Sequence, residues 1–148
     1  MLELRTIEET NRKAVEALAV AEEQKQYIAS NRESLLTAEK EKAVARPFAI
    51  YADDQPVGFA MFAFDEAYED PDDRYWLWRF MIDKNQQGRG YGSAAMEKII
   101  DYFRVHGAGH IKLSTKPTNR GALSLYHRFG FLENGEMNGE EVVLRLEL

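Results

Sequence analysis

Three glycines alternate with larger residues in the segment NQQGRGYGS, which runs from Asn85 to Ser93. The segment follows the apolar, aromatic stretch 74–83 and precedes a stretch with helical spacing. A helix start leaves main-chain N–H groups unpaired and carries about half a positive charge, so it can bind an anion such as phosphate. Glycine lacks the Cβ that would keep a phosphate at a distance, and Arg89 adds a cation. The pattern therefore favours a phosphate site over a simple tight turn.

Two common phosphate motifs do not fit this segment. A nucleoside-triphosphate loop needs Gly-Lys followed by Ser or Thr, whereas Tyr91 and Gly92 follow Gly90 here. A dinucleotide fingerprint needs a third glycine where this chain has Ser93, and an acidic residue about 20 positions further on. The strand-like stretch ahead, HIKLST, contains no acid. Neither ligand is therefore indicated.

Length, charge and cysteine content limit the class of protein. A chain of 148 residues suits one domain, 1–148, with a single core. The absence of cysteine excludes disulfides, zinc thiolates and cysteine nucleophiles, and we expect no metal site. The net charge of -6 disfavours nucleic acid as a partner. Since no stretch has the pattern of an export signal or a membrane span, we expect a soluble, cytoplasmic protein.

The spacing of apolar residues predicts the elements that position the glycines. Strands are expected at 2–7, 74–83 and 110–115, in a hairpin over 48–64, and in the tail around Asn138 and Gly139. Helices are expected at 11–20, 32–45, 92–107 and 119–130. The stretch 74–83 has almost no polar alternation, which predicts a central strand covered on both faces. The acid-rich stretch 65–73 is interpreted as a solvated connection. This order predicts an α/β fold, a mixed sheet with helices on its faces.

Two segments carry a resemblance to a known family. Gln87-Gly88-Arg89-Gly90-Tyr91-Gly92 fits the pattern Gln/Arg-x-x-Gly-x-Gly/Ala, and NRGALSLYHRFGF follows from Asn119 to Phe131. In both segments, their order and the surrounding elements, the chain resembles the GCN5-related N-acetyltransferase (GNAT) family. The resemblance implies the acyl-coenzyme A N-acyltransferase fold, with a central, mostly antiparallel sheet flanked by helices. The stretches EEQKQYIASNRESL, PVGFAMF, WLWRFMID and NGEEVVLRLEL resemble the bacterial spermine/spermidine acetyltransferases of that family.

The resemblance implies acetyl transfer from acetyl-coenzyme A to an amine, and it assigns residues to the cofactor. The strand before the glycines would pair with the pantetheine arm, the glycine segment would hold the pyrophosphate, and an asparagine would bind near the pantetheine. These positions are occupied by Met81, Ile82, Gln87, Gly88, Arg89, Gly90, Tyr91, Gly92, Ser93 and Asn119. Tyr126 corresponds to the tyrosine that protonates the departing thiolate, although its spacing with Leu123 and Phe129 would also suit a buried helix face.

The sequence leaves the acceptor more open. The resemblance implies a polyamine, spermidine or spermine, which would need carboxylates for its ammonium groups and aromatic rings for its methylene chain. Glu22, Glu23, Tyr27, Glu33 and Trp78 could form that pocket, and the three glutamates are also candidate bases because the strand before the glycines has no carboxylate ahead of Asp83. A tryptophan on a covered strand, such as Trp78, is more often a core residue than a pocket residue. Another small amine, a protein N-terminus, or a non-catalytic coenzyme A-binding role are the alternatives. Family members often pair as dimers, although no stretch here identifies an interface.

Overall fold

The strands form one mixed sheet. The computed structural model describes residues 1–148, and its strands are β1 (Leu2–Thr6), β2 (Ala45–Ala52), β3 (Gln55–Phe64), β4 (Tyr75–Ile82), β5 (His110–Thr115), β6 (Leu132–Asn138) and β7 (Glu141–Glu147). Their order is β1-β2-β3-β4-β5-β7-β6, and all neighbours are antiparallel except the parallel pair β4 and β5. The predicted mixed, mostly antiparallel sheet is confirmed, and β4 lies at its centre as its apolar sequence predicted.

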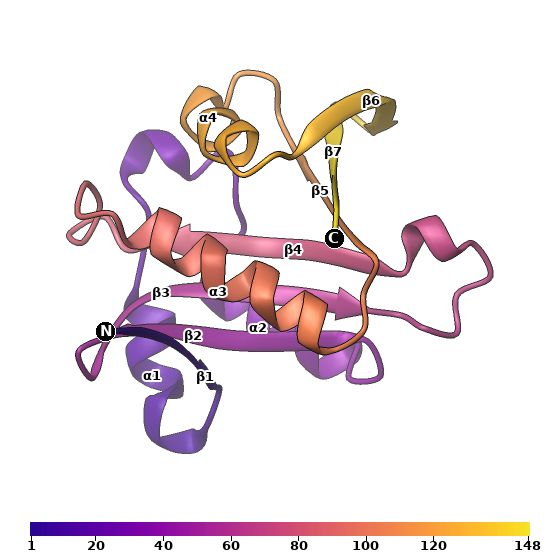
Figure 1. The fold of residues 1–148 in the computed structure, drawn as a ribbon. Helices are drawn as coiled ribbons and strands as arrows, with labels where there is room; N and C mark the ends of the chain where they lie inside the picture. Colours follow the sequence, from indigo (N-terminus) through magenta and orange to yellow (C-terminus); the bar gives the residue numbers. More distant parts are fainter.

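Helices cover both faces of the sheet. The four helices are α1 (Glu9–Ala17), α2 (Asn31–Lys40), α3 (Tyr91–Val105) and α4 (Arg120–Arg128), with short 3-10 turns η1 (Glu22–Gln24) and η2 (Pro71–Asp73). Figure 1 shows α3 across one face of β1–β4, α1 and α2 on the other face, and α4 beside the half of the sheet that holds β5–β7. None of these helices is long and apolar enough to cross a lipid bilayer.

The helix expected over 32–45 is shorter than predicted. α2 ends at Lys40, and β2 begins at Ala45, which pairs with Ala63 of β3. The residues between these elements are good helix formers, so local propensity favours a longer helix. Pairing with β3 overrides that propensity, because the strand ladder fixes the backbone from Ala45 onward.

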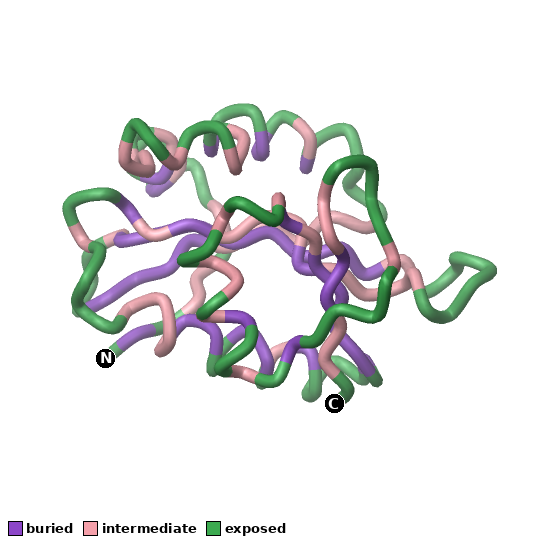
Figure 2. Tube along the Cα trace, turned by 90° about the horizontal axis from the view of Figure 1, so that it is seen from above, coloured by how far each residue is buried: buried purple, intermediate pink, exposed green.

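A separate apolar cluster packs on each face of the sheet. On the α3 face, Phe62 of β3 lies against Phe103 of α3, with ring centroids 5.0 Å apart. On the other face, Val15 of α1 and Leu35 of α2 join a smaller cluster that includes Phe59 of β3. Figure 2 shows buried stretches along the central strands and exposed stretches along the connecting loops. Both faces of β3 and β4 are therefore covered, which explains their nearly continuous apolar sequence.

β4 contains a bulge at Trp78. Its neighbours Leu77 and Arg79 pair with successive residues of β3, so Trp78 has no partner across that ladder. An extra residue of this kind reverses the alternation of side chains. Leu77 packs into the α3 cluster before the bulge, and Phe80 and Ile82 pack there after it.

β4 and β5 pair only where they begin. A single register contact, Trp76 with Lys112, joins the two strands before they diverge. Figure 1 shows β5 and β7 running at a steep angle to β4. One main-chain edge of β4 is therefore left without a neighbouring strand beyond the bulge.

Candidate active site

A large cleft opens where β4 and β5 diverge. Its volume is about 2070 Å³, whereas pockets for drug-sized ligands hold roughly 300–1,000 Å³. The lining comes from β4, β5, the glycine segment, α4, the segment between α1 and α2, one side of α2, and the β6–β7 hairpin. The cleft thus brings together most of the residues predicted to form a site, and it has room for two ligands.

The glycine segment leads directly into α3, as predicted. Gly88 and Gly90 have positive φ angles of 78° and 82°, a left-handed conformation that disfavours residues with a side chain. Gly90 is the residue that caps α3. None of the main-chain N–H groups from Gln87 to Ser93 donates a hydrogen bond within the chain. A row of unpaired donors at a helix start suits a phosphate or a diphosphate.

Side chains at the end of β4 hold the glycine segment in place. The Asp83 carboxylate accepts hydrogen bonds from the main-chain N–H groups of Ala19, at 2.9 Å, and Asn85, at 3.1 Å. The Gln87 side-chain amide donates to the side-chain oxygen of Gln24 in η1 at 3.0 Å. The loop after β4 is therefore tied to the segment between α1 and α2.

Alternate residues of β4 present their main chain to the cleft. The Asp83 N–H donates to β3 at 2.8 Å, whereas the Ile82 carbonyl, on the opposite edge, accepts from the Gln87 side chain at 3.0 Å. Main-chain groups of a strand alternate between its two edges, so those of Phe80 and Ile82 face the cleft and those of Met81 face β3. Met81 instead packs its side chain into the cluster on the α1–α2 face.

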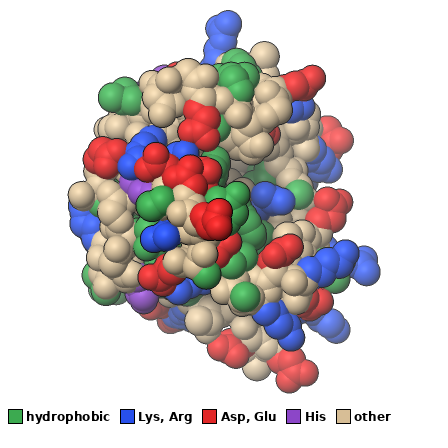
Figure 3. Space-filling model, turned by 90° about the vertical axis from the view of Figure 1, so that its right-hand side faces the viewer, with side chains coloured by type: hydrophobic (Ala, Val, Ile, Leu, Met, Phe, Trp, Pro, Cys, Tyr) green, Lys and Arg blue, Asp and Glu red, His purple; other side chains and the backbone are tan.

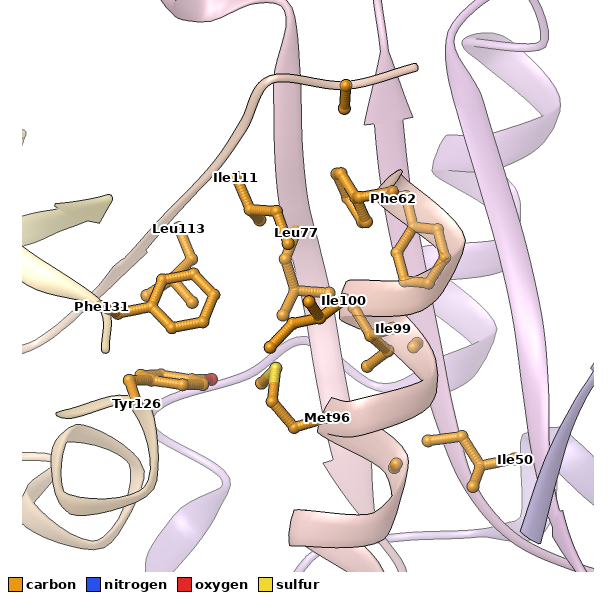
Figure 4. Packing of buried hydrophobic residues seen from close by; sticks show 14 of the residues in the cluster. Ile50, Phe62, Leu77, Met96, Ile99, Ile100, Ile111, Leu113, Tyr126 and Phe131 are labelled. Atoms are coloured by element: carbon orange, nitrogen blue, oxygen red, sulfur yellow. The ribbon is translucent and has the colours of Figure 1, made fainter. Parts of the chain in front are cut away.

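Tyr126 and Asn119 line the cleft from the α4 side. The Tyr126 ring packs against Phe131, and Figure 4 shows its hydroxyl oxygen pointing from α4 toward β4. Burial raises the pKa of Tyr126 to about 12, so the phenol keeps its proton at neutral pH and can donate a hydrogen bond. Asn119 precedes α4, and its amide donates to the Thr115 hydroxyl at 3.1 Å.

Carboxylates line two further walls of the cleft. Glu33, Thr37 and Glu41 recur at four-residue spacing and all line it, so one face of α2 points inward. Glu136 and Glu141 line it from the β6–β7 hairpin. We call the region between these walls the acceptor part of the cleft.

Two of the predicted site residues lie outside the cleft. The Glu22 side chain is 85% exposed and forms an ion pair with Lys25 at 2.8 Å. Glu22 therefore does not share a pocket with its neighbour Glu23, which does line the cleft. Arg89 is exposed and is likewise absent from the lining, so the unpaired donors that the glycine segment presents to the cleft are main-chain groups.

β4 contributes an aromatic and cationic patch. Trp76 and Trp78 are both partly buried and line the cleft, while Trp78 also packs against the α1–α2 cluster. Arg79 lines the cleft beside them, and its Nη1 donates to the Trp78 carbonyl at 3.0 Å. The Nε of Arg79 is buried and makes no hydrogen bond.

The segment between α1 and α2 spans the ends of the two diverging strands. The Tyr27 hydroxyl lies 3.3 Å from both the carbonyl and the hydroxyl oxygen of Thr118, which belongs to the connection after β5. On the other side, Gln24 contacts Gln87 after β4. Tyr27 lines the cleft, as does Glu23 from the same segment.

A buried ion cluster was not predicted from the sequence. The Lys112 side chain is 4% exposed, and its Nζ lies 3.1 Å from Asp73 Oδ1 and 2.8 Å from Glu136 Oε1. Burial disfavours the ammonium charge, but hydrogen bonds to Glu136 and Asp73 outweigh it, so the pKa of Lys112 is raised. The sequence did contain one sign of this cluster, the lysine inside the apolar strand HIKLST. A lysine that is buried in such a strand requires carboxylate partners.

The stretch 65–73 is therefore more than a solvated connection. Asp73 at its end lines the cleft and contacts Lys112. Figure 3 shows acidic side chains, interspersed with Lys and Arg, on the face of the molecule that carries this connection.

Comparison with known proteins identifies the family. The model of the Acetyltransferase (GNAT) family matches residues 7–131. The chain belongs to this family. It is 35% identical to the probable spermine N(1)-acetyltransferase of Bacillus subtilis subsp. natto (strain BEST195) and 34% identical to the spermine/spermidine N(1)-acetyltransferase of Bacillus subtilis (strain 168), in each case over 97% of both chains. The solved spermidine N-acetyltransferase from Vibrio cholerae, in complex with CoA and spermine, shares the fold with a TM-score of 0.71 and 22% identity, over 97% of this chain and 92% of that chain.

As a member of the GNAT family, the chain is an acetyltransferase whose acetyl donor is acetyl-coenzyme A. The cleft fits this donor. The unpaired N–H groups from Gln87 to Ser93 suit its diphosphate. The open edge of β4 at Phe80 and Ile82 suits an extended arm with amide groups, which can pair with it as an added strand would.

Replacing Gly90 by alanine is expected to weaken coenzyme A binding about tenfold, the size of one lost charge-assisted hydrogen bond. A Cβ at a φ of 82° is strained, and relief of that strain turns the neighbouring amides away from the diphosphate. The same strain should lower the free energy of unfolding by about 1 kcal/mol. Calorimetric titration and thermal unfolding measure the two effects. Gly109→Ala is the control, because its Cβ would meet open space; an unchanged affinity in Gly90→Ala would contradict the assignment.

Proposed function

We propose that the chain transfers acetyl from acetyl-coenzyme A to a primary amine of a polyamine such as spermidine or spermine. The observation that carries this proposal is the set of carboxylates in the acceptor part of the cleft, next to Trp76 and Trp78. Carboxylates suit ammonium groups, and indole faces suit both cations and a methylene chain. The two Bacillus relatives, which are named for spermine and spermidine, support the same acceptor class.

In this proposal the main chain positions the donor. Acetyl-coenzyme A supplies the acetyl group as a thioester, and the acceptor, which starts as an ammonium group, replaces the thiol to give an amide, a thiol and one released proton. The N–H groups from Gln87 to Ser93 hold the diphosphate, and the free edge of β4 aligns the arm. Asn119, which lines the same cleft, contributes a side-chain amide near that arm. Holding both reactants in one cleft lowers the entropic part of the barrier.

Tyr126 assists the departing sulfur. Its hydroxyl is protonated at neutral pH, because burial raises its pKa to about 12. An ordinary thiol has a pKa of about 8.5 and is therefore a stronger acid than this phenol. A hydrogen bond from the phenol to the departing sulfur thus stabilises the transition state more than complete transfer of the phenol proton does. That bond strengthens as charge develops on the sulfur, and it therefore stabilises the transition state more than the bound substrate.

The attacking amine must first lose a proton, because an alkylammonium group has a pKa of about 10.4. We assign the proton acceptor to Glu33. Its side chain lines the acceptor part of the cleft on the inward face of α2, whereas Glu23 lies on the segment at the ends of the strands.

A panel of acceptors tests the proposal. Thiol release at saturating acetyl-coenzyme A is measured with spermidine, spermine, an amino sugar, lysine, lysine amide and a short peptide with a free N-terminus. We expect kcat/KM to be highest for the polyamines, with the monoacetylated product visible by mass spectrometry. Turnover of other amines without turnover of either polyamine would overturn the proposal that the acceptor is a polyamine.

One observation favours a second acceptor class. Arg79 lines the cleft without a carboxylate partner. A guanidinium group that lines a cleft in this way suits a ligand carboxylate, which would make an amino acid the acceptor. The panel separates the two classes, because an Arg79–carboxylate contact predicts faster turnover of lysine than of lysine amide, and a polyamine enzyme does not.

A further inference from the structure

We propose that Lys112 is a positioning residue, which fixes the carboxylates of Asp73 and Glu136 as one wall of the acceptor part of the cleft and thereby sets the affinity for the amine. The inference rests on the proposed function only in requiring that an amine acceptor binds there. Lys112 itself does not touch the acceptor in this proposal; it acts through the two carboxylates.

Lys112 lies at the point where the cleft begins. It forms the single register contact between β4 and β5, opposite Trp76, and the strands separate beyond it. Its neighbours Ile111 and Leu113 pack into the α3 cluster, so its own side chain points to the other face of the sheet, where the acceptor part lies. The ammonium is 5.7 Å from the centre of the Trp76 ring, within the range of a cation–π contact.

The carboxylates of Asp73 and Glu136 both lie in segments that are not part of a continuous strand ladder. Asp73 ends η2 in the connection between β3 and β4. Glu136 lies where the pairing of β6 with β7 is interrupted, between Glu133 and Met137, next to Gly135 with its φ of 92°. The contacts of 3.1 Å and 2.8 Å to Lys112 therefore tie two irregular segments to the rigid strand β5.

Each carboxylate gives only one oxygen to Lys112. Asp73 Oδ1 and Glu136 Oε1 accept from its ammonium, while the second oxygen of each group makes no hydrogen bond within the chain. Both residues line the cleft, and their side chains are 35% and 38% exposed. The second oxygens are thus available to a ligand ammonium, whereas the 4% exposed Lys112 is enclosed behind them.

The test compares Lys112→Met, Lys112→Arg and the control Lys98→Met, with whichever amine the wild type acetylates best. Lys98 is an exposed lysine of α3 outside the cleft, so its replacement changes the net charge equally. We expect Lys112→Met to raise the KM for the amine roughly tenfold, the size of a lost charge-assisted hydrogen bond. The KM for acetyl-coenzyme A should stay unchanged, Lys112→Arg should restore part of the amine affinity, and Lys98→Met should behave as wild type.

A fourth variant separates positioning from folding. In Lys112→Met/Asp73→Asn/Glu136→Gln no buried charge is left unpaired, and η2 keeps its 3.1 Å ion pair between Asp72 and Arg145. The proposal requires this variant to regain wild-type thermal stability yet retain the high KM for the amine. A normal amine KM in the triple variant, or equal changes in both KM values in Lys112→Met, would overturn the proposal. Absence of polyamine turnover by the wild type would contradict the acceptor class instead, and the comparison would continue with the amine that is turned over.

Discussion

Replacing Tyr126 by phenylalanine is expected to lower kcat about 100-fold, the usual effect of removing one donor to a developing charge. The hydroxyl lines the cleft and makes no hydrogen bond within the chain, so the change removes a group that is free to act on the substrate. Binding of coenzyme A should be nearly unaffected, because the proposed diphosphate contacts are the unpaired N–H groups of the glycine segment. Single-turnover kinetics and calorimetric titration measure the two quantities.

Tyr75→Phe is the matched control, since Tyr75 packs against the same core but does not line the cleft. It should leave kcat unchanged. A Tyr126→Phe variant with wild-type kcat would remove the tyrosine from the mechanism. A wild type that binds coenzyme A but releases no thiol with any amine would point to a binding role without catalysis.

Because the pKa of Tyr126 is raised, its replacement should change how the free energy of unfolding depends on pH in the alkaline range. The pKa of this phenol is about 12 in the folded state, whereas the pKa of an unfolded tyrosine is about 10. Its contribution to stability is therefore complete below the unfolded value and is lost as the pH rises through the folded value. The stability of the wild type should fall relative to Tyr126→Phe over this interval, as measured by urea unfolding at several alkaline pH values.

Replacing Gly58 by alanine is expected to destabilise the fold by about 3 kcal/mol, at the upper end of the usual cost of overpacking. A Cβ at Gly58 would lie 2.4 Å from the Met81 carbonyl oxygen and 2.9 Å from Ile82 Cδ1. The first of these atoms is backbone, so relief requires β3 to move away from β4. Urea unfolding should show a lower midpoint with an unchanged m value.

Gly121→Ala is the control for this prediction, because its Cβ would meet open space within α4. It should be neutral or slightly stabilising, since alanine is the better helix former. Wild-type stability of Gly58→Ala would mean that the approach of β3 to β4 is looser than the 2.4 Å distance indicates.

The sequence predicted the elements better than it predicted their register. Apolar periodicity was sufficient to identify the central strand β4 and the helix after the glycines, because both patterns are local. The end of α2 was wrong, since pairing of Ala45 with β3 depends on residues far away in the chain. The local sequence does not indicate the bulge at Trp78 either. The residues near Trp78 are all large, and each could pack on either face of the sheet.

The same contrast applies to the site. The glycine segment, Asn119 and Tyr126 have motifs of fixed spacing, and the structure places all of them at the cleft. Lys112 is brought to Asp73 and Glu136 by the sheet order alone, across separations that no motif spans. Glu22 and Glu23 are neighbours in the sequence, yet only the second lines the cleft, because the Glu22 side chain points to solvent and is 85% exposed.

Because β4 diverges from β5, the cleft offers main-chain groups to one substrate and side chains to the other. In the proposed function the donor is bound by peptide groups, which are the same whatever the residue, so most substitutions leave that half intact. In the proposed function the amine is bound by side chains of α2, β4 and the β6–β7 hairpin that line the cleft, each of which can be exchanged without altering the peptide framework. A new acceptor can therefore arise by replacing a few surface side chains, while use of the acetyl carrier is inherited unchanged.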